Sequence, residues 1–412
     1  MRIVVLADSD SYVKWGAALA GSLDGADARL LLVESQFTVN EGQLRAALRG
    51  TGVEHLGSVT VRALPAAVAA LAPDAVLVAA PGPVAMVLIR AVARLDPRPV
   101  IVSGMPGISI PVTAKALRFR RQSDLMVVHS HREVREFAEL SRARGWDHRM
   151  GLARLPFASA PPPSARPRGT DLVFAPQAVV PREPGDRLYL AAMLRDAALA
   201  DPSRRVVVKL RALPGERSTH PERDAYPGLV ASLGPVPENL VFAAGAMSDA
   251  LEHAAGLVTV SSTALLEALA RGVPALAVED LGVSAELINP VFLESGLFGD
   301  REAVIGRRFR HPDPAWLADN YFHPAAESNW STTLEGLIAA RRAGDLPPRP
   351  ATTSRGRALR EAWDRKRALG SADRTVGGLA ALAIGHPARA AVRTIRAARR
   401  RLTPGASGQA TP

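Results

Sequence analysis

The most informative absence in this sequence is cysteine, which occurs nowhere in the 412 residues. Without thiols the chain cannot form disulfides, thiolate metal sites or a cysteine nucleophile. Apolar runs that approach the roughly 20 residues of a membrane span are also missing. The first residues, Met-Arg-Ile-Val-Val-Leu-Ala-Asp, predict a β-strand and lack the longer apolar core and the cleavage site of a signal peptide. We therefore expect a cytoplasmic protein.

Two nucleotide-binding signatures are missing as well. No Gly-x-Gly-x-x-Gly follows the first strand, and no Gly-x-x-x-x-Gly-Lys-Ser/Thr occurs. Their absence disfavours dinucleotide chemistry and P-loop chemistry. No spacing of histidines and carboxylates indicates a metal site. We therefore expect neither a bound metal nor a cofactor.

Acidic residues are scarce only at the C-terminal end. The net charge is +11, but the residues from Arg355 onward hold 13 Lys/Arg against only Glu361, Asp364 and Asp373. The rest of the chain is nearly neutral, which argues against nucleic-acid binding. The basic residues 355–402 could instead contact an anionic membrane surface. Four arginines there are spaced to share one helical face: Arg389, Arg393, Arg396 and Arg400.

What the chain does contain is an alternation of strands and helices that occurs twice. Runs rich in Val, Ile and Leu predict strands at residues 3–7, 28–33, 58–61, 75–79, 99–103 and 125–129. Similar runs occur at residues 171–175, 205–210, 239–242, 256–260 and 274–278. Continuous apolar strands separated by helices indicate parallel sheets covered on both faces. We predict an α/β protein with two Rossmann-like domains that face a cleft.

A Pro-rich stretch at residues 155–169 predicts a linker between an N-terminal domain, 1–154, and a C-terminal domain, 170–345. Residues 314–343 have a helical pattern and are expected to cross back to the first domain. Residues 346–412 are rich in Pro, Arg and Ser, with helical patterns at 354–369 and 388–402. This composition predicts a basic, partly disordered tail.

The strongest local motif is Val-Thr-Val-Ser-Ser-Thr-Ala-Leu-Leu-Glu-Ala-Leu-Ala-Arg-Gly-Val-Pro, which starts at Val258. It predicts a buried strand, a hydroxyl-rich turn and a short helix that starts at Ser261, Ser262 and Thr263. Unpaired N–H groups and the helix dipole favour an anion there. Glu267, one turn further along the same face, could accept hydrogen bonds from a ribose diol. Alternatively, the hydroxyls only cap the helix.

Lysine is rare in this chain, and one of the four lysines ends a predicted strand. Lys209 closes the strand at 205–210, and the loop that follows contains His220-Pro221. Ligands of doubly wound sheets bind beyond the carboxyl ends of the strands, where Lys209, His220 and the turn at 261–263 would all project. Together they suit a diphosphate. Taken singly, each could be an ordinary surface residue.

These motifs resemble the C-terminal half of GT-B glycosyltransferases. The nearest patterns belong to bacterial sialyl- and polysialyltransferases, capsule-polymer transferases and teichoic-acid-type glycerophosphotransferases, whose His-Pro and Ser-Ser or Ser-Thr motifs grip the nucleotide diphosphate. The stretches that begin at Ala7 and Ser103 are similar to an uncharacterised actinobacterial glycosyltransferase family. The resemblance covers residues 1–340. It implies a nucleotide-activated sugar donor, a glycan or lipid-linked acceptor of the cell envelope, and inversion at the transferred carbon.

The N-terminal half offers candidates for the acceptor side. Asp8 and Asp10 follow the first strand, where a carboxylate could deprotonate an acceptor hydroxyl, and we favour Asp8 as that base. Asp10 could equally cap the next helix. The glycines of Ser103-Gly104-Met-Pro-Gly107 could admit an acceptor or form a tight turn. His129 follows another strand and either faces the cleft or is structural.

We therefore predict a metal-independent glycosyltransferase. The C-terminal domain would bind the donor, the N-terminal domain would present the acceptor, and Lys209, His220 and the 261–263 turn would neutralise the leaving phosphate. Three alternatives stay open: a glycerol- or ribitol-phosphate transferase, a nucleotide-sugar epimerase, and a non-catalytic protein of envelope assembly that binds nucleotide sugars.

Overall fold

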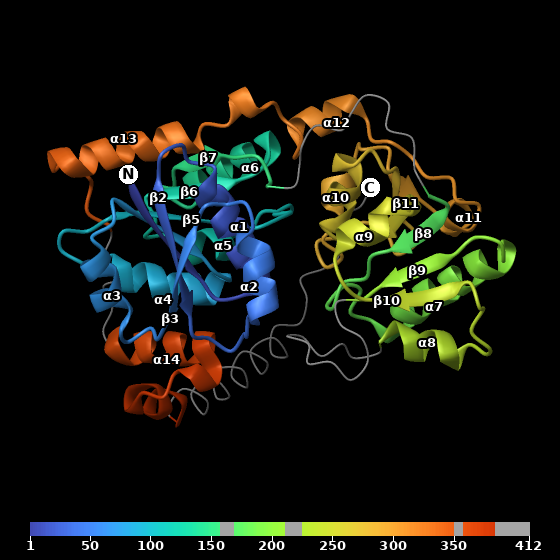
Figure 1. Cartoon of the computed structure of the whole chain (residues 1–412), viewed down its shortest axis with the longest axis horizontal. Helices are drawn as coiled ribbons and strands as arrows, with labels where there is room; N and C mark the ends of the chain where they lie inside the picture. Colours follow the sequence, from blue (N-terminus) through green and yellow to red (C-terminus); the bar gives the residue numbers. More distant parts are fainter. Residues whose placement is uncertain (157–168, 211–224, 350–356, 384–412) are drawn as a thin grey trace, which may run out of the picture.

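A computed structural model describes residues 1–156, 169–210, 225–349 and 357–383. In the N-terminal half, seven parallel strands form one sheet in the order β3-β2-β1-β4-β5-β6-β7 (Figure 1). The strands are β1 (Arg2–Ala7), β2 (Asp27–Val33), β3 (Glu54–Val59), β4 (Ala75–Ala79), β5 (Val100–Gly104), β6 (Leu125–Val128) and β7 (Met150–Leu152). The strand order reverses between β1 and β4, which makes their carboxyl ends the expected ligand-binding edge.

Helices cover both faces of this sheet, as parallel strands require. The helices are α1 (Asp10–Gly21), α2 (Glu41–Leu48), α3 (Leu64–Leu71), α4 (Gly82–Val92), α5 (Ala114–Phe119) and α6 (His131–Ala143). One face packs against α1 and α2, and the other packs against α3 and α4. Helix α1 lies directly on the sheet, because a Cβ on Gly16 would come within 2.8 Å of Val5 and 2.9 Å of Ala79. Only glycine permits this approach.

The C-terminal half repeats the architecture with six parallel strands in the order β10-β9-β8-β11-β12-β13. The strands are β8 (Asp171–Phe174), β9 (Val206–Lys209), β10 (Leu240–Ala243), β11 (Ala254–Thr259), β12 (Ala275–Val278) and β13 (Phe298–Gly299). Their helices are α7 (Pro184–Ala200), α8 (Tyr226–Ser232), α9 (Met247–Glu252), α10 (Ala264–Ala270), η1 (Pro290–Phe292) and α11 (Arg301–Ile305). The prediction of two Rossmann-like α/β domains is confirmed.

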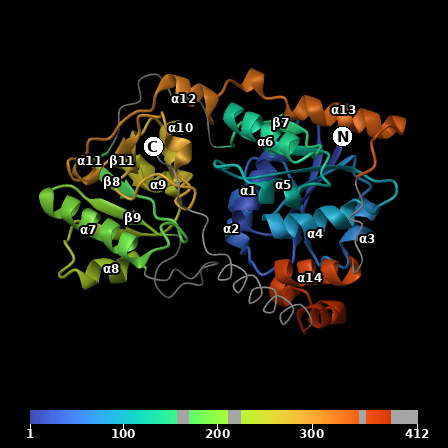
Figure 2. The same ribbon diagram turned by 180° about the vertical axis from the view of Figure 1, so that it is seen from behind.

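The chain then returns to the first domain. Residues 314–343, which we call the return segment, comprise α12 (Pro314–Asp319), η2 (Ala325–Glu327) and α13 (Trp330–Ala343). Trp316 of α12 packs in the C-terminal core, whereas Trp330 and Leu334 of α13 pack in the N-terminal core. Figures 1 and 2 show this segment running along one side of both domains. The return segment therefore belongs to both domains.

A further helix, α14 (Arg357–Leu369), is followed by η3 (Gly370–Ala372) and lies against α4 on the far side of the N-terminal sheet from α13. Asp364 pairs with Arg90 at 3.0 Å, and Glu361 pairs with Arg94 at 2.6 Å. Leu369 joins the apolar core beneath α4. The start of the predicted tail is thus folded onto the N-terminal domain, whereas residues 384–412 lie outside the described residues.

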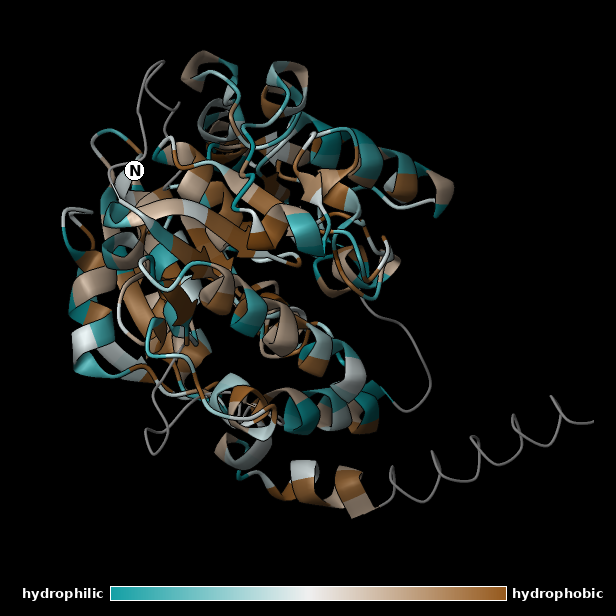
Figure 3. Ribbon diagram, turned by 90° about the vertical axis from the view of Figure 1, so that its right-hand side faces the viewer, coloured by the Kyte–Doolittle hydropathy of each residue, from teal (hydrophilic) through white to brown (hydrophobic). Residues whose placement is uncertain are grey.

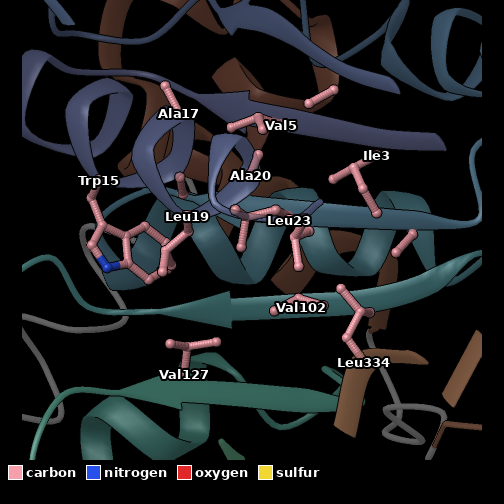
Figure 4. Close-up of a cluster of buried hydrophobic side chains, with 14 of the residues drawn as sticks. Ile3, Val5, Trp15, Ala17, Leu19, Ala20, Leu23, Val102, Val127 and Leu334 are labelled. Atoms are coloured by element: carbon pink, nitrogen blue, oxygen red, sulfur yellow. The ribbon is translucent and has the colours of Figure 1, made fainter. Parts of the chain in front are cut away.

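The strands consist largely of hydrophobic residues, which are brown in Figure 3. The N-terminal core contains Trp15 and Leu19 of α1, Val102 of β5, Val127 of β6 and Leu334 of α13 (Figure 4). Among the described residues, no helix is both long enough and apolar enough to cross a membrane. The cores place the loops that carry the candidate residues at the facing edges of the two sheets.

Several short elements were missing from the sequence prediction. The strands β7 and β13 have only three and two residues, too few to give a periodic signal. Strand β3 starts at Glu54, four residues before the predicted start, because its first residues are exposed at the sheet edge and carry no apolar pattern. Neither difference moves a strand end that carries a candidate residue.

Candidate active site

The two domains meet through the loops at the carboxyl ends of their strands. A Cβ on Gly107, in the loop after β5, would lie 3.0 Å from Oγ1 of Thr263, in the turn after β11. Ile110 of the same loop packs among the core residues of the C-terminal domain. The structure therefore brings together two motifs that are more than 150 residues apart in the sequence.

The hydroxyl-rich turn is organised by hydrogen bonds within the C-terminal domain. Ser261 is buried and donates its hydroxyl proton to Oε1 of Gln177 at 2.7 Å. The hydroxyl of Ser262 accepts a hydrogen bond from the N–H of Ala264 at 3.2 Å, so it helps to cap α10. Because Ser262 acts there as the acceptor, its own proton is still available to a ligand. Ser262 and Thr263 are only half-buried.

Gln177, after β8, was missed by the sequence reasoning. Its amide nitrogen donates to the carbonyl of Ser261 at 3.2 Å, in addition to the bond that its oxygen accepts from the Ser261 hydroxyl. Two hydrogen bonds therefore link the loop after β8 to the turn after β11. The order of the C-terminal sheet reverses between these two strands. The signal in the sequence was a polar side chain that follows the buried strand β8.

Lys209 ends β9 on the same edge of the sheet. Its Nζ donates to the carbonyl of Gly245 at 2.7 Å. Burial lowers its pKa, and Asp249 partly opposes this effect. Within the described part of the chain, no carboxylate forms an ion pair with Lys209. Counting the described residues only, one of its three N–H donors has an acceptor in the protein. His220 lies outside the described residues.

Glu267 lies on α10 and faces the N-terminal domain. Burial raises its pKa, while the charges of Arg271 and of Lys14 on α1 lower it. Lys14 in turn forms an ion pair with Asp10 at 2.9 Å. Asp10 sits in the first turn of α1, after the N-cap residue Ser9, and does not itself cap the helix. Asp10, Lys14 and Glu267 therefore form a row of charges across the junction of the domains.

Asp8 follows β1 and is almost completely buried. Burial raises its pKa from 3.8 to about 6, although the nearby hydroxyls of Ser9 and Ser35 oppose the shift. The hydroxyl of Ser9 is 3.2 Å from Oδ1, whereas Oδ2 is buried without a hydrogen-bond partner. Because its pKa is raised, this carboxylate is a stronger base than a solvated one. A carboxylate with a pKa of about 6 is still mostly ionised at neutral pH.

Asp8 also lies on the wall of a cavity of about 1170 Å³ in the N-terminal domain. The floor is formed by residues that follow β2 and β3, such as Ser35 and Thr60. One side is formed by α4 and the other by α14 and the residues that follow it. Apolar and charged side chains of these elements both line it, among them Val33, Val39, Val61, Val87, Arg90, Arg94, Leu369 and Arg365. The cavity can hold a ligand larger than a single sugar.

Ser103, Gly104 and His129 are structural in this arrangement. Ser103 is buried and donates to the carbonyl of Val78 at 2.8 Å. A Cβ on Gly104 would come within 2.7 Å of the Trp15 ring. His129 accepts a hydrogen bond from the Trp15 indole at 2.7 Å through Nε2, and its Nδ1 donates to the carbonyl of Ala153 at 2.8 Å. Burial lowers the pKa of His129 to about 4, so the ring is neutral at pH 7.

Glu133 of α6 is a second residue that the sequence did not single out. Its buried carboxylate accepts hydrogen bonds from the N–H groups of His129, at 2.8 Å, and Ser109, at 2.9 Å. A third comes from the hydroxyl of Tyr321 in the return segment, at 2.7 Å. Burial raises the pKa of Glu133. This carboxylate ties the glycine-containing loop after β5 to both domains.

Several solved structures are similar to this chain in fold. The S. aureus protein MnaA, in complex with UDP, is 10% identical with a TM-score of 0.54, and the alignment covers 86% of this chain and 100% of MnaA. The UDP-GlcNAc 2-epimerase of Neisseria meningitidis, bound to UDP-GlcNAc, is 11% identical with a TM-score of 0.52, over 82% and 100%. A UDP-glucosyltransferase from Polygonum tinctorium is 14% identical with a TM-score of 0.49, over 83% and 98%.

No curated protein matches this sequence. The family model described as "Putative glycosyltransferase (DUF6716)" matches residues 3–337, which include both Rossmann-like domains and most of the return segment. The chain therefore belongs to this glycosyltransferase family and has the GT-B architecture.

Proposed function

We propose that this protein transfers a sugar from a nucleotide sugar to an acceptor that is bound in the N-terminal domain. In the donor, the sugar is linked to a nucleoside diphosphate or monophosphate, which departs in the reaction. The donor phosphates would lie between Lys209 and the hydroxyls of Ser262 and Thr263, with His220 as a further ligand. Glu267 would accept hydrogen bonds from the ribose. UDP sugars are the first donors to test, because proteins of the same fold bind UDP and UDP-GlcNAc.

The acceptor would occupy the cavity beside Asp8. The observation that carries this proposal is the buried Asp8 carboxylate, with one oxygen that lacks a hydrogen-bond partner and a pKa of about 6, on the wall of a ligand-sized cavity. Such a group can take the proton of an acceptor hydroxyl at neutral pH. The attack of that oxygen on the sugar would then proceed in line with the departing phosphate and invert the anomeric carbon.

The leaving phosphate would be stabilised without a metal ion at the donor site. Among the described residues, the carbonyl of Gly245 takes one of the three N–H donors of Lys209, and no acceptor takes the hydroxyl proton of Ser262. Fixed donors aimed at a developing charge stabilise a transition state because they need no reorganisation when the charge forms.

The acceptor would be a glycan or a lipid-linked glycan of the cell envelope, reached from the cytoplasmic side of the membrane. The cavity lining supports this class, since it includes both apolar side chains and arginines. All three acidic residues from Arg355 onward pair with arginines, one of which, Arg90, lies on α4. The arginines from Arg389 onward would supply the charge that attracts an anionic membrane surface.

The experiment starts with a thermal-shift screen of nucleotides and nucleotide sugars. The donor that stabilises the protein most is then incubated with the enzyme, with and without glycan and lipid-linked acceptors, and products are separated by mass. Sugar transfer that depends on the acceptor supports the proposal. Transfer of a polyol phosphate from a CDP-alcohol would identify a glycerol- or ribitol-phosphate transferase. Nucleotide binding without turnover would identify a binding protein of envelope assembly.

A nucleotide-sugar 2-epimerase is the second candidate, because epimerases are among the structures that align with TM-scores above 0.5. The two functions differ in their need for an acceptor. An epimerase converts UDP-GlcNAc in the absence of any acceptor, and the product keeps its nucleotide or releases UDP. Proton NMR of UDP-GlcNAc incubated with the enzyme alone distinguishes them.

A further inference from the structure

The junction of the two domains contains a cluster of metal-ligating side chains that the proposed donor and acceptor sites do not use. His131 is the first residue of α6, in the N-terminal domain. His323 and Glu327 belong to the return segment, between α12 and α13. The two groups are separated by about 190 residues in the sequence, which is why no local spacing indicated a metal site.

The three side chains converge closely. Their potential ligand atoms all lie within 4.8 Å of one another. Nε2 of His131 is 2.6 Å from Oε2 of Glu327, and the imidazole rings of His131 and His323 have centroids 5.4 Å apart. When an ion lies about 2.0–2.2 Å from each of three ligand atoms, the ligand atoms themselves are a few ångströms apart, as they are here. Small side-chain movements would therefore complete the coordination.

His323 is the residue that points to a ligand. It is 1% exposed, and its Nε2 is buried without a hydrogen-bond partner. Its Nδ1 contacts the carbonyl of Pro324 at 3.1 Å, which favours a proton on Nδ1 and leaves a lone pair on Nε2. An unsatisfied buried nitrogen is costly, and a bound ion would satisfy it.

The surroundings do not repel a cation. The nearby arginines of α6 are each paired, Arg132 with Glu136 at 2.7 Å and Arg135 with Asp319 at 2.6 Å. Glu327 therefore supplies the uncompensated negative charge of the cluster. The side chains of His131 and Glu327 are 37% and 46% exposed, which gives an ion a path from solvent.

We propose that His131, His323 and Glu327 bind one divalent transition-metal ion, of which Zn²⁺ is the representative, and that this ion joins α6 to the return segment. Two imidazoles and one carboxylate are a ligand set that Zn²⁺ accepts, with water in the fourth position. The ion would be structural, because none of its ligands belongs to the residues proposed to hold the donor or Asp8. It would fix the angle at which the domains face each other.

The test uses the full chain, freed of metal with a chelator and then titrated with ZnCl₂ by calorimetry. We expect one tight site per chain. His323→Gln and, separately, His131→Gln should weaken it by more than the roughly 10- to 100-fold that loss of an outer-shell partner costs. His311→Gln removes an exposed histidine outside the cluster and should leave the site unchanged. Co²⁺ in place of Zn²⁺ should give the visible spectrum of a tetrahedral site only when all three ligands are present.

The outcome does not depend on the glycosyltransferase reaction. Absence of a tight site in the wild-type chain overturns the proposal, and so does equal Zn²⁺ affinity in wild type, His323→Gln and His131→Gln. Because His323 is buried, circular dichroism of the metal-free variants checks that they fold, and His131→Gln, at a partly exposed position, provides the second reading. Nucleotide binding in the same samples reports on the donor site separately.

Discussion

The hydroxyl of Tyr321 donates a hydrogen bond of 2.7 Å to Oε1 of Glu133, and both residues are completely buried. The bond joins the return segment to α6 of the N-terminal domain. Since Glu133 also accepts from the N–H of Ser109, the same carboxylate holds the loop that approaches Thr263. The relative position of donor and acceptor loops therefore depends on this pair.

Replacement of Tyr321 by Phe should destabilise the protein. The carboxylate of Glu133 loses one of three hydrogen-bond donors in a buried place, which costs about 1–3 kcal/mol. Chemical unfolding of both proteins measures the difference. Tyr189→Phe is the control, because the hydroxyl of Tyr189 bonds to Asp280 at an exposed position and its loss should change stability by no more than about 0.5 kcal/mol. Equal effects of the two substitutions would contradict the role given to Glu133.

Asp8→Asn should lower turnover by about 10²-fold or more and leave donor affinity intact, because an amide cannot accept the acceptor proton. In a plot of the wild-type turnover rate against pH, the rate should rise with pH around pH 6, where Asp8 loses its proton. Asp10→Asn is the matched variant. A dead Asp10→Asn beside an active Asp8→Asn would assign the base to Asp10, and two active variants would exclude both.

The same Asp8→Asn substitution should stabilise the fold at neutral pH. The folded-state pKa, about 6, lies above the unfolded value of 3.8, so the folded state holds the proton more tightly between these values. Wild-type stability is therefore lost as pH rises from about 4 to about 6, by up to roughly 3 kcal/mol. Urea unfolding should show similar stability of the two proteins at pH 4 and a more stable variant at pH 8. A variant less stable than wild type at pH 8 would contradict the burial of an ionised Asp8.

Lys209→Met and Ser262→Ala should each weaken nucleotide binding. Each loses a hydrogen bond to a charged phosphate, which corresponds to about 1.5–3 kcal/mol. His220→Ala should have a similar effect if that residue contacts the phosphates. Lys115→Met, on the exposed surface of α5, is the control and should not change affinity. Calorimetry with the nucleotide found in the screen measures the affinity. If both Lys209→Met and Ser262→Ala bind the nucleotide as tightly as wild type, these residues do not form the donor site.

Gly107→Ala should impair activity with little loss of stability. The added Cβ would lie 3.0 Å from Oγ1 of Thr263, so one of the two loops must move by a few tenths of an ångström. In the double variant Gly107→Ala/Thr263→Ala, the loss of activity should be smaller than the sum of the losses in the two single variants. The reason is that the second substitution removes the contact. Gly185→Ala has no neighbour within 4 Å of its Cβ and serves as control. Strictly additive effects on kcat/KM would show that the two loops do not meet.

Removal of residues after Ala383 should abolish binding to anionic vesicles at low salt. Each arginine near the surface contributes on the order of 1 kcal/mol, and salt screens it. Truncation at this point preserves α14, whose Asp364 and Glu361 pair with Arg90 and Arg94 of the N-terminal domain. Co-sedimentation with anionic and neutral vesicles compares the shortened chain with the full one. Equal sedimentation of the two chains with anionic vesicles would exclude a membrane role for residues 384–412.

The fold was predictable because its determinants are local. Continuous apolar segments such as β1 and β4 are buried on both faces, and only parallel strands between helices satisfy that pattern. Two such series separated by a Pro-rich stretch gave two Rossmann-like domains. The positions of Asp8, Lys209 and Ser262 at strand ends followed from the same reasoning, since parallel strands end on one edge.

Tertiary structure decided which of those residues are accessible and which are only structural. His129 and Gly104 follow or end strands as Asp8 does, but Trp15 of α1 packs on both, and this contact lies more than 85 residues away in the sequence. Other contacts of this kind are the hydrogen bond between Ser261 and Gln177 and the hydrogen bond between Tyr321 and Glu133. The ring contact between His323 and His131 is a third. Periodicity and spacing report what a residue's own segment requires, whereas these contacts join segments far apart in the sequence. The contacts of Trp15 and Gln177 form within one domain, and those of Tyr321 and His323 form where the return segment meets α6.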